Sequence, residues 1–305
     1  WPKSSMTVML FCPKAITPAM SKRRARPLKR STPLTACATG TPSAMLAAIA
    51  DESIGKFGIK NEAVATEIAD DLRSATFRVA SVERKALKKN PPPPFTTSTL
   101  QQEGVKRLRF SSKKTMMLAQ RLYEGGHITY MRTDSVNLSA DSIQAARSWI
   151  TENLGGRYAL EGGRAFKTKS KLAQEAHEAI RPTDVAVVPE SVPMEDDGAR
   201  KLYQLIWSRF VASQMPTAEV ASTVLVVDAK GKRNYTLRAA GQTITFDGYL
   251  KIWPQKLEER ELPKLEASDP LTLDSVTPAQ HFTEPPPRFS EATLVKALEE
   301  FGIGR

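Results

Sequence analysis

The 305-residue sequence has little cysteine, little histidine and no long apolar run. No apolar stretch approaches the roughly eighteen residues that a membrane-spanning helix needs, so we expect no transmembrane segment. The two cysteines, Cys12 and Cys37, match neither a zinc-binding spacing nor a disulfide framework, and we expect a reducing, intracellular setting. With only three histidines, a metal site of the zinc-protease type is excluded. The composition, 41% apolar and 25% charged, is ordinary for a globular protein of two or three domains.

Acidic residues are absent from the first fifty positions. These residues therefore supply +8 of the net charge of +11, which leaves +3 for residues 51–305. The cluster Ser21 to Arg30 is basic enough to bind phosphates or to act as a targeting signal, and its composition is similar to that of a transit peptide. Because the chain begins with Trp1 rather than methionine, we expect a fragment. We interpret residues 1–50 as a disordered basic tail or as sequence unrelated to the rest.

Periodicity divides the remaining chain into helical and strand-like regions. The proline run "NPPPP", Asn90 to Pro94, excludes regular structure and marks a boundary. The block from there to residue 217 is mainly helical. Helices are expected over residues 61–75, 98–108, 111–124 and 199–215, in a segment that follows a loop at 155–175 and stops at Pro182, and after the N-cap Ser290.

Strand-like alternation occurs on both sides of the helical block. Residues 76–85 form one run of alternating apolar and polar residues. Residues 218–252 hold three further strand-like runs, separated by glycine-containing turns. We expect these strands to pair, so that the helical block is an insertion between two halves of one β-rich unit. The chain is thus predicted to be a multi-domain protein of mixed α and β structure. The expected domains are residues 1–50, residues 51–89 with 218–250, residues 90–217, and residues 251–305.

A tyrosine and an arginine stand two residues apart in "GGHITYMRTDSVNLS", Gly125 to Ser139. Read as a strand after the glycine pair, this stretch puts Tyr130 and Arg132 on one face together with Ile128. A phenol with a pKa of about 10 is a weak nucleophile, and a permanent cation beside it favours the phenolate and can also hold a phosphate. The pair would suit attack on a phosphodiester. The alternative is a half-buried tyrosine that only packs.

The stretch "EAHEAIRPTD", Glu175 to Asp184, holds a second candidate pair. On a helix His177 and Arg181 are four apart, so they face the same way and could close on one oxyanion. The alternative is a surface histidine and arginine that form solvated pairs with Glu175 and Glu178. The residue pattern alone leaves both readings open.

Four long motifs together resemble the type IA DNA topoisomerases, specifically the bacterial DNA topoisomerase I group. They are "PPPPFTTSTLQQE", "KKTMMLAQRLYEGGHITYMRTDSVNLS", "EAHEAIRPTD" and "HFTEPPPRFSEATLVKALEEFGIGR", in order between Asp51 and Arg305. The resemblance implies that Tyr130 attacks one DNA strand and forms a 5′-phosphotyrosine link. It implies that Arg132 positions the scissile phosphate, that His177 and Arg181 act at the same site, and that Arg305 contacts DNA.

The same resemblance implies a fold and a set of partners. The fold would be a helical cap domain, residues 90–217, inserted into a β-rich arch around a hole for DNA, followed by the start of a helical DNA-binding domain. The substrate would be single-stranded and negatively supercoiled DNA, relaxed without ATP by a monomer in the bacterial cytoplasm, or in an organelle if the basic segment is a transit peptide. Expected DNA contacts come from Lys113, Gln120, Arg132 and Arg305.

Family members also carry an N-terminal Toprim domain with a catalytic glutamate and a D-x-D-x-[DE] cluster that binds Mg²⁺. No D-x-D occurs in this sequence. We therefore expect Mg²⁺ only in the full enzyme, no metal ligands here, and weak single-strand binding with little or no relaxation by this chain alone. Two other readings remain. Residues 98–124, with Lys113, Lys114, Gln120 and Arg121, could be a non-catalytic helix-turn-helix that binds DNA, or the chain could be a degraded gene product.

Overall fold

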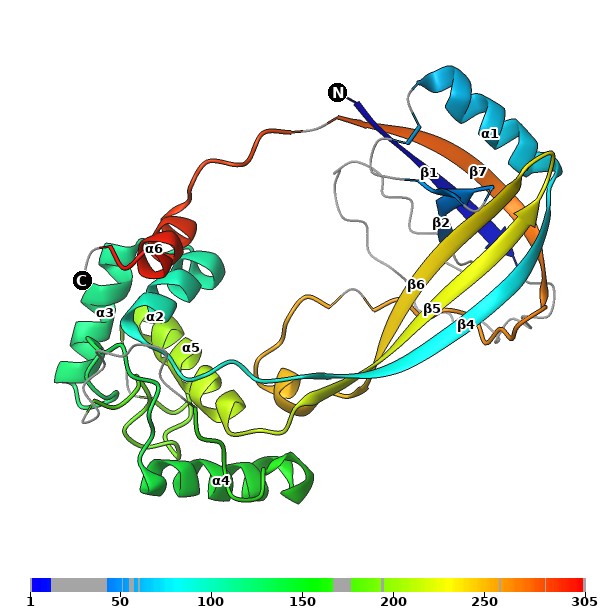
Figure 1. Ribbon diagram of the computed structural model, residues 1–305. Helices are drawn as coiled ribbons and strands as arrows, with labels where there is room; N and C mark the ends of the chain where they lie inside the picture. Colours follow the sequence, from blue (N-terminus) through cyan, green and yellow to red (C-terminus); the bar gives the residue numbers. More distant parts are fainter. Residues whose placement is uncertain are drawn as a thin grey trace. The chain divides into compact units, whose positions relative to one another are not determined.

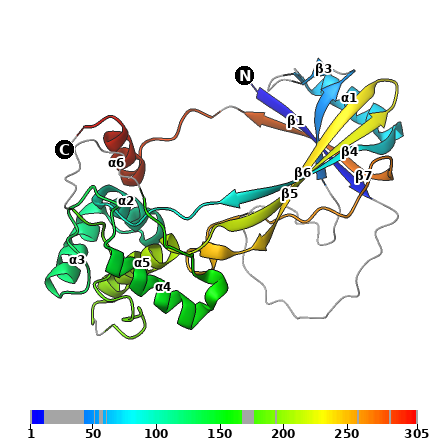
Figure 2. The same ribbon diagram turned by 60° about the horizontal axis from the view of Figure 1, so that its bottom comes forward.

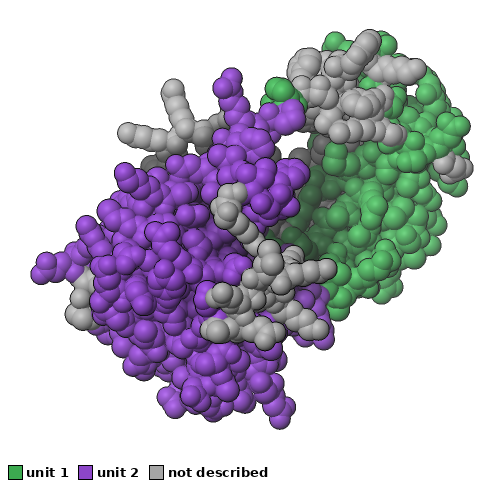
Figure 3. Space-filling view, turned by 60° about the vertical axis from the view of Figure 1, so that its left-hand side comes forward, with its two compact units in different colours: residues 1–87, 220–244, 257–285 green, residues 88–219, 245–256, 286–305 purple. Residues whose placement is uncertain are grey.

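The computed structural model describes most of the chain in two compact units, which Figure 3 colours separately. Unit 1 comprises residues 1–87, 220–244 and 257–285, and unit 2 comprises residues 88–219, 245–256 and 286–305. Among the described residues no helix is both long and apolar enough to cross a membrane. The described residues are 2–11, 43–50, 52–54, 58–59, 61–166, 177–192, 195–257, 259–282 and 284–303.

An antiparallel sheet dominates unit 1 (Figures 1 and 2). Its strand order is β1-β7-β4-β5-β6-β2-β3, and a further pairing of β1 with β2 closes the order into a ring. The predicted strand at 76–85 is present and longer than expected. The three runs expected over 218–252 form only two strands, because Gly241 lies inside β6 rather than in a turn, and residues 248–251 form a short 3-10 helix. The strands are β1 (Pro2–Phe11), β2 (Ser43–Ile49), β3 (Glu52–Ser53), β4 (Thr76–Lys89), β5 (Ala218–Lys230), β6 (Asn234–Phe246) and β7 (Pro270–Phe282).

Strands β1 and β2 fall within residues 1–50, where the sequence predicts no fold. Strand β1 pairs along β7 from Pro2 opposite Phe282 to Phe11 opposite Thr272, with one irregularity between Met9 and Leu10. Its backbone groups are satisfied by β7, a partner some 260 residues away in the chain, so local composition does not reveal the pairing. The basic cluster Ser21 to Arg30 lies outside the described residues.

Helix α1 (Glu62–Ser74) confirms the predicted amphipathic helix and covers the sheet's apolar face. The Asn61 side chain caps it by accepting a hydrogen bond from the Val64 amide at 3.0 Å. Its buried face packs into the main core of unit 1, which removes apolar surface from water. That core consists of Ala44, Ile59, Ala65, Ile68, Ala69, Leu72, Phe77, Val79, Leu225, Val227, Ala229, Tyr235, Leu237, Ala239, Leu265, Leu271 and Val276.

A buried carboxylate, Asp71, joins α1 to the turn between β5 and β6. It accepts hydrogen bonds from the backbone amides of Lys232 at 2.7 Å and Arg233 at 3.1 Å, and from the hydroxyl of Tyr235 at 2.7 Å. Gly231 fits against it because a Cβ there would lie 2.5 Å from the carboxylate. Burial acts to raise the pKa of Asp71, but the hydrogen bonds from Tyr235 and the two amides outweigh it and lower this pKa below its usual value.

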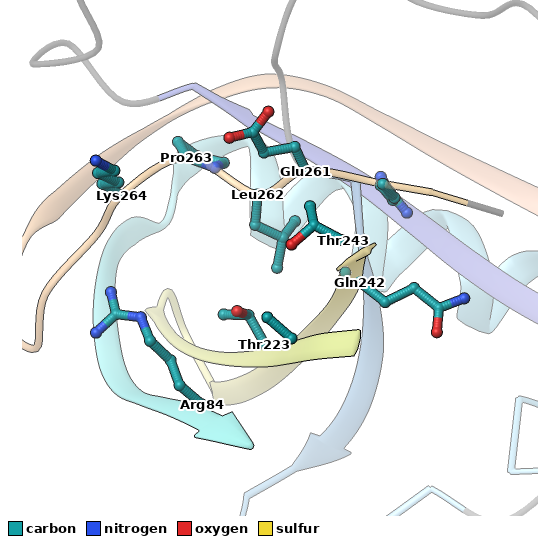
Figure 4. A pocket seen from close by; sticks show the side chains of 11 residues that line it. Arg84, Thr223, Gln242, Thr243, Glu261, Leu262, Pro263 and Lys264 are labelled. Carbon is teal, nitrogen blue, oxygen red and sulfur yellow. The ribbon is translucent and has the colours of Figure 1, made fainter. Parts of the chain in front are cut away.

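A small hollow in unit 1 lies where residues 260–264 cross the sheet (Figure 4). The crossing is fixed by paired backbone hydrogen bonds of 3.0 Å between Gln242 and Arg260. Gly241 permits this close approach, since a Cβ there would lie 2.5 Å from the Arg260 carbonyl oxygen. Arg84 is not free, because its guanidinium donates to the Leu265 carbonyl at 3.1 Å.

Unit 2 is mainly helical. Helices α3 and α5 pack side by side, as do α2 and α6 (Figures 1 and 2). The predicted helix at 98–108 is present, but a short π-helix forms its second half and ends at Arg109, whose φ is 58°. The elements are α2 (Thr97–Glu103), η1 (Gly104–Leu108), α3 (Ser112–Glu124), α4 (Ala140–Leu154), η2 (Gly156–Tyr158), α5 (Asp197–Ser213), η3 (Gly248–Lys251) and α6 (Glu291–Glu300).

An aromatic residue, Trp253, connects several parts of unit 2. The Arg107 guanidinium lies 3.8 Å from its ring centroid, and the Phe95 ring meets it edge-on with centroids 6.0 Å apart. The Arg209 guanidinium lies 5.0 Å from the same ring and donates to the Pro93 carbonyl at 2.6 Å. Burial lowers the pKa of Arg209 to about 10. These contacts fix the chain where it enters the helical unit.

Candidate active site

Tyr130 lies on the connection between α3 and α4, and this connection is not the strand that the sequence predicts. Only Ile128 pairs as in a sheet, in an isolated bridge to Pro182. The other hydrogen bonds run to several segments. The Thr129 amide donates to the Arg181 carbonyl at 2.9 Å, and the Thr97 amide donates to the Thr133 carbonyl at 2.9 Å. Because its partners change along its length, the segment cannot form a regular ladder.

Burial along this loop anchors it on both sides of the tyrosine. Ile128 and Met131 are each only 1% exposed, whereas Tyr130 is 48% exposed. The Thr129 hydroxyl donates to the Ala179 carbonyl at 2.7 Å, which fixes the residue directly before the tyrosine. The loop therefore presents a phenol to solvent from a backbone that is held in place.

Arg132 is also exposed. Ile128 does not share this exposed side as the strand pattern requires, because it is buried. The alternative, a half-buried tyrosine that only packs, agrees with the partial burial of the Tyr130 ring. It does not account for the hydroxyl. Within the described parts of the chain, that hydroxyl has no hydrogen-bond partner.

The predicted helix that stops at Pro182 is absent over residues 177–182. The backbone there is extended: the Ala179 amide donates to Asn137, and the Ile180 amide donates to Phe95, each at 2.9 Å. Ala179 and Ile180 are fully buried, so tertiary packing overrides the local helical pattern. Residues 167–176, including Glu175, lie outside the described residues.

Arg181 is engaged by a carboxylate rather than open to a ligand. Its Nε and Nη2 donate to the two carboxylate oxygens of Glu178 at 2.7 and 3.0 Å, and Nη1 donates to the Pro182 carbonyl at 2.9 Å. Glu178 also accepts from the Ser139 amide at 3.1 Å. Burial acts to raise the pKa of Glu178, but the bonds from Arg181 and Ser139 outweigh it and lower this pKa below its ordinary value. His177 is exposed at the start of the same stretch.

Helix α3 carries two of the predicted DNA contacts. Lys113 is exposed in its first turn, while Gln120 is half-buried and donates to Glu124 at 2.7 Å. The helix packs through Thr115, Leu118, Ala119 and Leu122. Lys113 is therefore open to a phosphate, whereas Gln120 already has a partner. Arg305 lies outside the described residues.

The sequence does not predict two of the contacts near Tyr130. Tyr123, on the last turn of α3, lies edge-to-face with Tyr130, with ring centroids 5.2 Å apart and planes at 66°. The pair of Glu178 with Arg181 agrees with the alternative reading of that motif, but its partial burial and the bond that Glu178 accepts from the Ser139 amide were not expected. The spacing of seven residues between the tyrosines gave a weak signal, because it implies contact only if the helix stops between them. The Gly125-Gly126 pair does stop it, with Gly126 at a φ of 73°.

A metal site does not fit the described residues. Nowhere among them do three or more His, Cys, Asp or Glu side chains gather so that they could hold an ion. The Mg²⁺ that the resemblance implies therefore has no ligand set in this part of the chain, and we derive no step through it.

Comparison with known proteins defines the class. The sequence model of the DNA topoisomerase family matches residues 36–305, and the chain belongs to this family. The resemblance read from the four motifs is thus confirmed.

Similar curated proteins and a solved structure narrow the comparison. The DNA topoisomerase 1 of Rickettsia felis is 45% identical over 279 residues, covering 86% of this chain and 36% of that protein. The DNA topoisomerase 1 of Salmonella typhimurium is 51% identical over 237 residues, covering 77% and 27%. The full-length topoisomerase I of Thermotoga maritima matches all of this chain and 45% of its own, with a TM-score of 0.73 and 33% identity. The predicted mixed fold is confirmed, and the chain spans about a third of the length of the curated relatives it matches.

Proposed function

We propose that the protein relaxes negatively supercoiled DNA by transient cleavage of one strand, and that this chain supplies the nucleophile, the Tyr130 hydroxyl. One observation supports the proposal most: a chain of the DNA topoisomerase family holds an exposed phenol on an anchored loop, with an exposed arginine two residues on. Anchoring matters because a reacting group held in one geometry loses little freedom on the way to the transition state.

The step is a transesterification. The Tyr130 oxygen forms a bond to the scissile phosphorus, the bond from phosphorus to the 3′-oxygen breaks, and that oxygen leaves as a 3′-hydroxyl after gaining a proton. The phenol proton passes to solvent or to a base. The 5′-phosphotyrosine keeps the energy of the phosphodiester, so reversal by the 3′-hydroxyl reseals the strand without ATP. Between the two steps another strand passes through the break.

The cations around Tyr130 take different roles in this proposal. Arg132 is exposed, so its fork can contact the scissile phosphate and offset the charge of the transition state. His177, also exposed, acts at the same site. Arg181 is bound by Glu178, so it would serve mainly by holding the loop, and would meet the phosphate only if Glu178 were displaced.

The remaining parts of the proposal concern the whole protein. We assign the Mg²⁺ and the proton-transferring glutamate to a Toprim domain of the whole enzyme, the partners to single-stranded and supercoiled DNA, the active form to a monomer, and the location to the bacterial cytoplasm. Lys113 and Arg305 extend the DNA contact. For this chain alone we expect weak single-strand binding and no relaxation.

An oligonucleotide with an activated leaving group tests the nucleophile in this chain itself. A single-stranded oligonucleotide carrying a 5′-(p-nitrophenyl) phosphodiester needs no proton donor, because p-nitrophenolate leaves without one. We expect the wild-type chain to release p-nitrophenolate once per molecule and to become covalently joined to DNA. Tyr130→Phe should bind the oligonucleotide with unchanged affinity and form no adduct.

The matched controls are Tyr158→Phe, at a tyrosine whose hydroxyl donates to Asp247 at 2.8 Å, and Tyr203→Phe, at a buried tyrosine of α5. Both should keep adduct formation. Tight binding of duplex DNA, with no adduct in any variant, would instead favour the non-catalytic DNA-binding module.

A further inference from the structure

The proposed nucleophile makes one described ring contact, with a second exposed tyrosine. Tyr123 is 40% exposed on the last turn of α3, and its ring meets the Tyr130 ring edge-to-face with centroids 5.2 Å apart. Aromatic pairs favour this arrangement because the positive ring edge meets the negative ring face. The contact is thus attractive and directional, and it lies at the surface where no tight packing imposes it.

Other restraints on the Tyr130 ring are few. The backbone is fixed by the buried neighbour Met131 and by the hydrogen bonds of Thr129, but these do not set the side-chain torsions. Nor does any hydrogen bond from the described residues reach its hydroxyl. A half-exposed side chain with a fixed backbone still samples several rotamers. The Tyr123 ring is in direct contact with the Tyr130 ring, so it can favour one of these rotamers.

The position of Tyr123 is itself well defined. Its carbonyl accepts from the Gly126 amide at 2.9 Å in the turn that ends α3, and Leu122, its neighbour on the helix, is buried. The turn and the buried neighbour hold the backbone at Tyr123, so its ring has a fixed origin from which to meet the Tyr130 ring.

We propose that Tyr123 is a positioning residue for the cleavage reaction: its ring holds the Tyr130 ring in the orientation from which the hydroxyl attacks phosphorus. This inference rests on the proposed function of Tyr130. The ring of Tyr123 supplies the effect, not its hydroxyl. Loss of an edge-to-face pair should lower the fraction of correctly oriented nucleophile by roughly three- to tenfold.

The experiment compares Tyr123→Ala and Tyr123→Phe with wild type, using the p-nitrophenyl-activated oligonucleotide on the 305-residue chain. Single-turnover rates at saturating oligonucleotide are measured separately from the dissociation constant. Tyr123→Ala should lower the rate constant roughly three- to tenfold and change the dissociation constant less than about twofold. Tyr123→Phe should restore the wild-type rate. Met117→Ala, at an exposed residue on the same helix, is the control and should match wild type.

Each contrary result has a defined meaning. A wild-type rate in Tyr123→Ala overturns the inference. So does weaker binding with an unchanged saturated rate, which would make Tyr123 a platform on which bases stack. Thermal unfolding tells loss of fold from loss of orientation, and Tyr123→Leu, which keeps helix propensity and bulk, must show the same rate loss as Tyr123→Ala. If wild type forms no adduct, the proposed function of Tyr130 fails, whereas an active wild type with a fully active Tyr123→Ala defeats only this inference.

Discussion

Each of the two units contains a carboxylate that links separate segments of that unit, and the two carboxylates have different partners. In unit 1, Asp71 is buried and accepts hydrogen bonds from two backbone amides and the Tyr235 hydroxyl, all of them neutral donors. In unit 2, Glu178 is 30% exposed at its side chain, and its main partner is the cation Arg181. The first carboxylate fixes a turn, while the second neutralises Arg181, whose backbone carbonyl accepts from the amide of Thr129, the residue before Tyr130.

The ion pair of Glu178 changes which cations of the two motifs are available to bind a phosphate. The two motifs, each with one histidine and one arginine, suggest several groups ready to receive a phosphate. Arg181 is not ready in this way, because its two-point contact with Glu178 occupies the guanidinium nitrogens that would bind a phosphate. Arg132 and His177 remain exposed. Of these three cations, one is thus held by a carboxylate and two stay exposed.

The largest effect on stability should come from removing Asp71, the carboxylate whose hydrogen-bond donors are all neutral. Asp71→Ala leaves two amides and a phenol without their acceptor, so we expect the free energy of unfolding to fall by about 2–4 kcal/mol. Urea unfolding followed by circular dichroism measures it. The matched control is Asp70→Ala, where an exposed carboxylate pairs with Arg73 and the loss should stay below about 1 kcal/mol. Equal effects at both positions would contradict the role given to Asp71.

Removing Glu178, the carboxylate that pairs with a cation, should lower stability less than removing Asp71 and should lower adduct formation more. Glu178→Ala leaves Arg181, 15% exposed at its side chain, without its partner, and we expect a loss of about 1–3 kcal/mol because the pair is only partly buried. The end of the Tyr130 loop at Ser139 is released too, so adduct formation should slow.

A double-mutant cycle isolates the pair. Glu178→Ala combined with Arg181→Met should cost less than the sum of the two single substitutions, because neither then leaves an unpaired charge. Strict additivity would show that the two side chains do not depend on each other.

The smallest effect is a difference in acid sensitivity. The pKa values of Asp71 and Glu178 are both lowered in the folded state, so each stabilises the fold above its unfolded pKa, about 3.9 and 4.3, and this stabilisation is lost as the pH falls through the folded values. Unfolding free energies measured between pH 7 and pH 3 should decline below about pH 4. Asp71→Asn and Glu178→Gln should each flatten that decline, and an unchanged slope in both would contradict the assignment.

Much of the fold was predictable because local signals carry it. The N-cap Asn61, the cap Ser111 and the proline run at 90–94 mark boundaries that the structure keeps. The strands 76–85 and 218–252 alternate because one face of the sheet is buried. Strand β1 was missed because its pairing with β7 is entirely non-local.

The roles of the candidate site residues stay predictions, and the backbone around them differs from the one that the sequence predicts. Tyr130 and Arg132 are both exposed, but both backbone predictions were wrong: the strand at 127–133 and the helix that stops at Pro182. Each segment is the hydrogen-bond partner of the other, through Thr129 and Arg181 and through His127 and Thr183. The residue pattern of one segment does not reveal a hydrogen-bond partner some fifty residues away in the chain. The contact of Tyr123 with Tyr130 is local, and it depends on the turn that ends α3 between them.

The central claim is that the Tyr130 oxygen becomes bonded to a DNA phosphorus. Peptide mapping by mass spectrometry, after the chain has reacted with the p-nitrophenyl-activated oligonucleotide and been digested, tests it most directly. We predict one modified peptide, with the nucleotide mass on Tyr130. An adduct on Tyr123 or any other side chain, or an adduct that persists in Tyr130→Phe, would contradict the account.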